Sequence, residues 1–128
     1  VTGVQTCALP ISALPAFWVG LMYDQTALDS AWDLVRGLDA ETREGLRVAA
    51  SVSALQGQAG GVRLLDLARA AVGLSHAGLV ARGLGEEVLL QPLVASLKTG
   101  QVQADRWLAL YESDWGRDLA PLYAAASL

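Results

Sequence analysis

The longest helical pattern of the chain is VRLLDLARAAVGLSHAGLVAR, Val62–Arg82. Its apolar residues recur three and four positions apart, which is the spacing of one helix face. Gly83 and Gly85 follow, and glycine is favoured just after a helix end. Gly73 and Gly78 each weaken a helix by up to about 1 kcal/mol relative to alanine, so we expect close helix packing at both. The stretch predicts a long helix in a mainly α fold.

An apolar run, residues 15–23, precedes this stretch. Its length suits either a buried strand or a two-turn helix, which periodicity alone does not separate. Proline is preferred at the first helical position, so Pro15 favours a helix that begins there.

Two further helices are predicted between this run and Val62. Thr26 and Asp29 have the spacing of a capping box, and an apolar stripe follows them to Val35. Gly37 is the expected stop of this helix. Asp39 is placed to cap the next helix.

The rest of the chain adds short helices. Residues 56–61 hold three glycines and are typical of a loop. A helix is predicted over residues 92–98 with Gly100 as its stop, another over residues 104–111, and a last one capped by Asp118. The sequence thus predicts six or seven helices and no internal repeat.

The composition limits the classes of partner. The chain has 128 residues, enough for one domain, with 53% hydrophobic and 17% charged residues. Nine basic residues stand against 13 acidic ones, and the net charge is −4. Nucleic-acid binding needs clustered Lys and Arg, and none cluster here, so we predict no nucleic-acid partner.

The first 23 residues contain no charged side chain. A signal peptide would begin with positive charge, and a spanning helix would need about 20 apolar residues without Pro10 and Pro15. We therefore expect neither a signal peptide nor a membrane segment.

Residues 1–11, VTGVQTCALPI, resemble the in-frame translation of a widely used sequencing adaptor over their whole length. We therefore interpret 1–11 as an artefact and 12–128 as the native segment, and we expect the chain to be the tail of a longer protein. Cys7, the one cysteine, falls in the adaptor-like part, so no native disulfide or thiol chemistry is expected.

The residues suggest no active site. Asp24, Asp29 and Asp33 lie at helix starts and on polar faces, where acids serve as caps and solvated surface groups more often than as metal ligands. His76 stands alone, and a structural role is favoured over a catalytic one. We predict no catalytic, cofactor-binding or metal-binding residue in this chain.

Four tryptophans fall mostly on apolar faces, so the favoured interpretation is that they anchor a core rather than form a stacking platform. They are Trp18, Trp32, Trp107 and Trp115.

Three segments together resemble a known family. They are LPAFWVGLMYD (14–24), ALDSAWDLV (27–35) and DWG (114–116). In this order they are similar to the C-terminal end of plant-type glutamate–cysteine ligases, which also occur in many alphaproteobacteria. The family's usual TPA before the penultimate helix is replaced by Val102, Gln103 and Ala104.

The resemblance implies a fragment of an enzyme that uses ATP and magnesium to join glutamate and cysteine into γ-glutamylcysteine, the first step of glutathione biosynthesis. It implies that these helices complete an α+β ligase whose antiparallel sheet and active site lie in a missing N-terminal catalytic half. The 14–24 segment would bury its aromatic residues against that catalytic half. We expect an inactive, structural fragment that binds no cofactor alone, and a bacterial cytoplasmic location. The alternative is a non-enzymatic helical interaction module.

Overall fold

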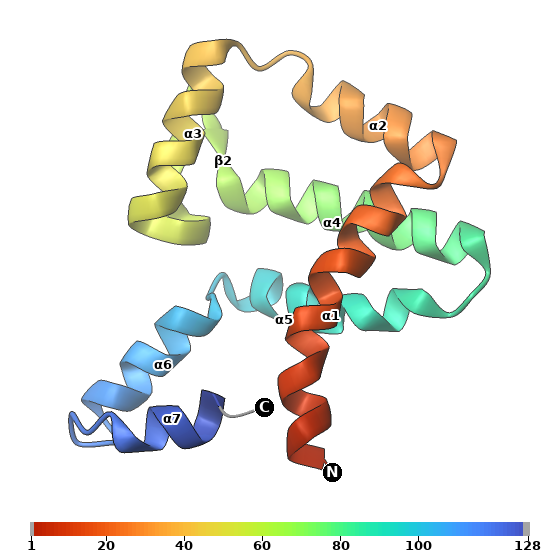
Figure 1. Cartoon of the computed structure of the whole chain (residues 1–128). Coiled ribbons are helices and arrows are strands. Elements are labelled where there is room, and N and C mark those ends of the chain that lie inside the picture. Colours follow the sequence, from red (N-terminus) through yellow and green to blue (C-terminus); the bar gives the residue numbers. More distant parts are fainter. Residues whose placement is uncertain (1, 127–128) are drawn as a thin grey trace.

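A computed structural model describes residues 2–126 of the chain, and the side chains of residues 11–125 (Figure 1). The prediction of a mainly α fold with six or seven helices is confirmed, because the described residues form seven α-helices and one small hairpin. The elements are α1 (Thr2–Met22), α2 (Gln25–Val35), α3 (Ala40–Ser53), η1 (Ala54–Gln56), β1 (Gln58–Ala59), β2 (Val62–Arg63), α4 (Leu64–Arg82), η2 (Glu86–Leu90), α5 (Gln91–Thr99), α6 (Gln103–Glu112) and α7 (Ala120–Ala126).

Several predicted helix ends are confirmed by their capping geometry. Asp39 Oδ1 accepts a hydrogen bond from the Thr42 backbone N–H at 2.7 Å, at the start of α3. Gly83 and Gly100 adopt left-handed conformations, with φ of 71° and 69°, at the ends of α4 and α5. Asp118 Oδ1 accepts a hydrogen bond from the backbone N–H of Ala120, the first residue of α7, at 3.0 Å. These ends depend on local side-chain and backbone chemistry.

The prediction that a helix begins at Pro15 is wrong, because α1 runs through this residue from Thr2. Proline inside a helix removes one backbone hydrogen bond, but its fixed φ is compatible with helical geometry. Packing of α1 against α4 supplies the compensation, since tertiary contacts contribute most of the stability of helices in proteins.

The predicted capping box of α2 is also wrong. The helix begins two residues earlier than expected, so Thr26 lies within its first turn. Asp24 takes the N-cap role, and its Oδ2 accepts from the Ala27 backbone N–H at 2.9 Å. Gly37 is not among the glycines with positive φ and does not act as a left-handed stop. The helix ends at Val35.

The predicted loop at 56–61 contains a minimal β-hairpin. Gln58 pairs with Arg63 and Ala59 with Val62, in antiparallel register. Gly60 and Gly61, both with positive φ, form the turn between the strands. Strands of two residues are too short to show an alternating pattern, so only the glycines indicated a turn here.

The closest packing in the fold is the crossing of α1 and α4 (Figure 1). A Cβ atom on Gly78 would overlap the carbonyl oxygen of Gly20, and one on Gly20 would overlap Ser75. Ser75 is fully buried, and its Oγ donates to the Phe17 carbonyl at 2.8 Å. The predicted close packing is therefore confirmed at Gly78. It is wrong at Gly73, where a Cβ would meet nothing within 4 Å.

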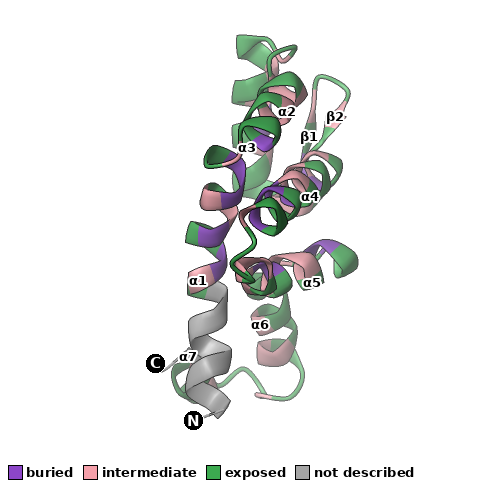
Figure 2. Ribbon diagram, turned by 90° about the vertical axis from the view of Figure 1, so that its right-hand side faces the viewer, coloured by how far each residue is buried: buried purple, intermediate pink, exposed green. Residues whose placement is uncertain are grey.

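The core lies along α4. One cluster joins Ala16 of α1 to Leu79 and Leu90, and a second joins Leu65 and Val72 to Leu97 of α5. Figure 2 shows the buried residues concentrated where α1, α4 and α5 meet, whereas α6 contains none. The fold is thus organised around the central helix that the sequence pattern predicts.

By length and composition alone, α4 passes the test for a membrane-spanning helix, as the core helix of a soluble protein also can. Its contacts with α1, α2 and α5 place it inside the helical assembly. We interpret α4 as a core helix.

Candidate functional site

The acidic residues near the start of α2 are occupied by local interactions. Asp24 caps the helix, and Asp29 accepts from Gln25 Nε2 at 2.8 Å. Asp33 pairs with Arg36 at 3.1 Å, and both side chains are exposed. Among the residues that the structure describes, no three His, Cys, Asp or Glu side chains gather in a way that suits a metal ion. Asp24 is therefore a helix cap, and Asp29 and Asp33 have local partners.

His76 does not have the structural role that the sequence suggested. Its side chain is exposed on α4 and lines a groove between α4 and α5. The residue follows the buried Ser75, and adjacent positions of a helix point to different sides, so burial at 75 does not extend to 76.

The expectation that the tryptophans anchor the core is wrong for Trp18 and Trp32. Their exposed fractions are 53% and 64%. Trp107 and Trp115 are partly buried. Large aromatic side chains contribute most when they are buried, so these two contribute little to the core of this chain.

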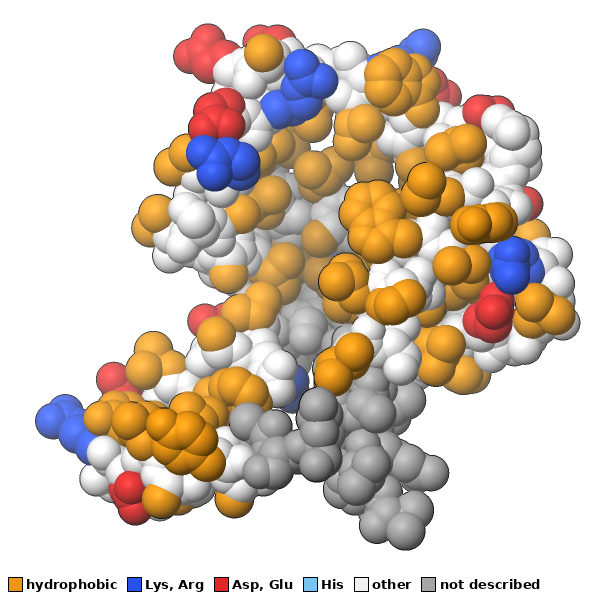
Figure 3. All heavy atoms as spheres, in the orientation of Figure 1, with side chains coloured by type: hydrophobic (Ala, Val, Ile, Leu, Met, Phe, Trp, Pro, Cys, Tyr) orange, Lys and Arg blue, Asp and Glu red, His pale blue; other side chains and the backbone are white. Residues whose placement is uncertain are grey.

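The outer face of α1 carries large apolar side chains, and we call Leu14, Trp18 and Met22 the α1 stripe. They are spaced four apart, so they share one side of the helix. Each is more than half exposed. In Figure 3 hydrophobic side chains gather along the described part of α1.

The inner face of α1 includes small residues at its closest contacts with the rest of the chain. Ala13 and Ala16 are buried there, and Gly20 touches α4. Leu21 is also buried, and Phe17 and Val19 pack against the core, whereas the stripe residues stay outside. Apolar side chains therefore lie on both sides of α1, and only the inner ones are covered by this chain.

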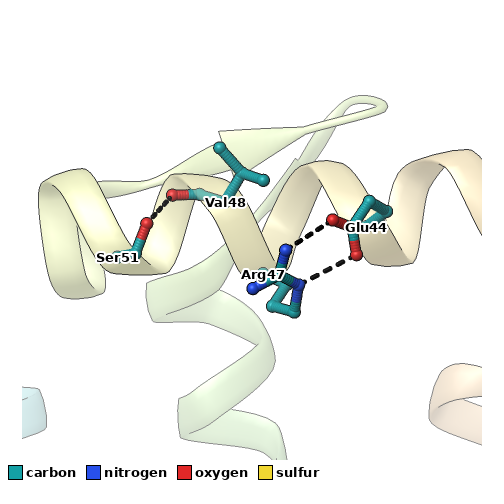
Figure 4. Close-up of polar contacts among 4 residues, drawn as sticks. All are labelled: Glu44, Arg47, Val48 and Ser51. Carbon is teal, nitrogen blue, oxygen red and sulfur yellow. Dashed lines mark hydrogen bonds and ion pairs between the residues drawn. The ribbon is translucent and has the colours of Figure 1, made fainter.

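The outer face of α3 provides a contrast within the same chain (Figure 4). Arg47 donates to both carboxylate oxygens of Glu44, at 2.9 and 2.6 Å. This pairing lowers the pKa of Glu44 and raises the pKa of Arg47. Such a face is suited to water. The described part of α1 has no charged residue at all, so its stripe is suited to a second apolar surface.

A polar contact lies at the C-terminal end of the stripe. The Arg82 guanidinium is 5.6 Å from the centre of the Tyr23 ring, within the range of a cation–π interaction. Arg82 Nε also donates to Glu86 Oε2 at 2.9 Å. These contacts hold Arg82 beside the junction of α1 and α2.

Exposed apolar patches of more than a few hundred Å² are uncommon on isolated soluble proteins and mark interaction surfaces. The periodic pattern of α1 indicated an apolar helix, but it did not show which face the rest of the chain would cover. The α1 stripe is thus the candidate functional site, and its chemistry is that of an interface.

Comparisons with known proteins bear on this interface. The family model of glutamate–cysteine ligase family 2 matches residues 4–125. The chain is 35% identical over 113 residues to the chloroplastic glutamate–cysteine ligase of Nicotiana tabacum, and 38% identical over 113 residues to ligase A of Oryza sativa subsp. indica. Each alignment covers 88% of this chain, but 22% of the tobacco protein and 23% of the rice protein.

The chain therefore spans less than a quarter of the length of these relatives. The Arabidopsis thaliana enzyme, 33% identical over 113 residues, is also named as chloroplastic. The expected bacterial cytoplasmic location is wrong on this comparison, because these relatives are plant chloroplast enzymes. The resemblance seen in the sequence identified the family, but it did not identify the cellular location.

Proposed function

Because this chain belongs to glutamate–cysteine ligase family 2, we propose that it is the C-terminal helical part of an ATP-dependent ligase. The reaction joins glutamate and cysteine into γ-glutamylcysteine, the first step of glutathione biosynthesis. The role of these helices is structural: the α1 stripe packs against the preceding part of the same chain, which forms the catalytic half. The observation that carries this proposal is the α1 stripe, a row of large apolar side chains that the described part of this chain leaves more than half exposed.

The energy of such packing is substantial. Full burial of a large apolar side chain contributes about 1.5–3 kcal/mol. Leu14, Trp18 and Met22 are each more than half exposed, so much of this contribution is unused within the chain. The part of the relatives that this chain does not match exceeds three quarters of their length, which is ample for a covering surface.

ATP and magnesium would be held by the preceding part of the enzyme. Magnesium in ATP-dependent enzymes is bound by carboxylates and phosphate oxygens. The described residues offer no converging set of acidic side chains, and Asp24, Asp29 and Asp33 already have local partners. We therefore assign no catalytic, cofactor-binding or metal-binding role to this chain.

The experiment that tests the proposal is long-read sequencing of the source DNA through the codons of residues 1–12. We expect a reading frame that enters at Ser12, lacks the adaptor-like residues 1–11 and encodes a ligase catalytic half upstream. The full-length product should form γ-glutamylcysteine from glutamate and cysteine with ATP. A native start codon at or near Ser12 would contradict the proposal.

A non-enzymatic helical interaction module remains the competing function. It predicts that residues 12–128, produced alone, unfold cooperatively and stay monomeric. The ligase-tail proposal predicts that the same segment binds a hydrophobic dye and self-associates through the α1 stripe. Analytical ultracentrifugation with and without dye separates the two.

A further inference from the structure

A second surface feature lies away from the α1 stripe, in the groove between α4 and α5. Its volume is about 540 Å³, which is within the range of small-molecule sites. Val72 of α4 and Val94 and Leu97 of α5 contribute apolar lining. A ligand in this groove would therefore contact an apolar surface between two helices.

Two of the four polar side chains that line the groove are cations, Arg69 and Lys98, and the other two are His76 and Gln91. Arg69 and His76 come from α4, and Lys98 comes from the last turn of α5. No acidic residue is among those that line the groove, although the chain as a whole has a net charge of −4. Positive charge is thus concentrated locally, in a chain that is otherwise acidic.

The guanidinium of Arg69 is held in place. Its Nε and Nη2 donate to the Leu97 carbonyl at 3.3 and 2.9 Å, across the groove. Asp66 lies 4.0 Å from its Nη1 and is not part of the lining. A donor that is already ordered loses less conformational entropy when it binds an anion.

Gly73 supports the idea that the groove is kept open. It lies in the middle of α4, where glycine weakens a helix relative to alanine. No described atom lies within 4 Å of a Cβ built on it, so packing inside the chain does not require glycine there. Its backbone lines the groove, and a side chain would occupy that space.

We propose that the α4–α5 groove binds a small organic anion, with an apolar body on Val72, Val94 and Leu97 and a carboxylate or phosphate group near Arg69 and Lys98. The group gains charge-assisted hydrogen bonds from these side chains. This site is independent of the proposed docking of the α1 stripe.

The test uses the 128-residue chain and three probes with the same octyl body: octanoate, octyl phosphate and neutral 1-octanol. Backbone amide shifts in residues 69–76 and 91–98 are followed by NMR during titration. We expect saturable shifts with octanoate or octyl phosphate, and the stronger of the two identifies the preferred head group. Equal shifts with 1-octanol, or none with either anion, would overturn the proposal.

Two variants test the charge and the shape of the site separately. Lys98→Gln should weaken anion binding about two- to fivefold, as expected for one exposed ion pair. Gly73→Leu should abolish binding by filling the groove, while its helix content by circular dichroism stays the same or rises, because leucine favours helix. Arg43→Gln on α3 removes an equal charge outside the groove and should leave binding unchanged. An unaltered affinity in both Lys98→Gln and Gly73→Leu would sink the assignment.

Discussion

Gly73 and Gly78 both lie inside α4, but only Gly78 is closely packed. Gly78 meets the Gly20 carbonyl and lies near Ala27, whereas Gly73 faces open space. We expect Gly78→Ala to destabilise the fold by about 1–3 kcal/mol through overpacking. Gly73→Ala should stabilise it by about 0.5–1 kcal/mol through helix propensity. Urea unfolding of both variants measures the difference, and a change of the same sign in both would contradict the α1–α4 crossing.

The cap that Asp39 provides at the start of α3 makes the stability of the fold depend on pH. The hydrogen bond from the Thr42 backbone N–H, followed by that from the Thr42 side chain, lowers the pKa of Asp39. A lowered pKa in the folded state stabilises the fold above the unfolded value of about 3.9, and this stabilisation is lost as the pH falls through the folded pKa.

We therefore expect Asp39→Ala to lower the unfolding midpoint at pH 7, and the gap to wild type to shrink below about pH 4. Asp39→Asn keeps a capping side chain that does not titrate, so its unfolding midpoint at pH 7 should fall less than that of Asp39→Ala. Thermal melts between pH 2.5 and pH 7 measure both. A gap that is independent of pH would exclude the Asp39 cap as its cause.

At the scale of one element, α1 depends on partners on two sides. Within the chain, Leu79 of α4 is fully buried and belongs to the cluster that contacts α1. Leu79→Ala should cost about 2–5 kcal/mol of unfolding free energy. Leu84→Ala, at a position 65% exposed, should change it by less than about 0.5 kcal/mol. Equal losses would show that the α1–α4 core is not formed.

The other side of α1 is the stripe. Replacing Trp18 and Met22 with glutamate should lower dye binding and self-association of the 128-residue chain, because charge makes an exposed apolar face compatible with water. Val52→Glu on α3, at a position 81% exposed, is the matched control and should change neither by much. If the control reduces dye binding as strongly as the stripe variant, the stripe is not the surface that binds the dye.

At the scale of the whole molecule, burial is uneven. The central α4 contains Leu65, Val72, Ser75, Gly78 and Leu79 as buried residues, whereas α6 has none. Local opening is cheapest where few apolar contacts are broken. Hydrogen exchange should therefore protect α4 amides most strongly and α6 amides much less. Equal protection of α4 and α6 would argue against a core centred on α4.

The sequence by itself determined what depends on near neighbours. The helix predicted over Val62–Arg82 is confirmed from Leu64 onward, whereas Val62 and Arg63 form β2. The Asp39 cap and the stops at Gly83 and Gly100 are confirmed, because each involves groups within a few residues of one another. The ordered segments from Leu14 onward also identified the family, to which the family model independently assigns the chain.

Only the tertiary structure decided which side of each element is covered. Gly78 is closely packed whereas Gly73 is not, and α1 continues through Pro15. Trp18 is exposed, whereas Ala16 on the same helix is buried. Identical local patterns can be buried or exposed, because burial depends on residues distant in sequence that pack against them. The same reason makes the α1 stripe informative: its exposure is a property of this chain without the surface that we propose covers it.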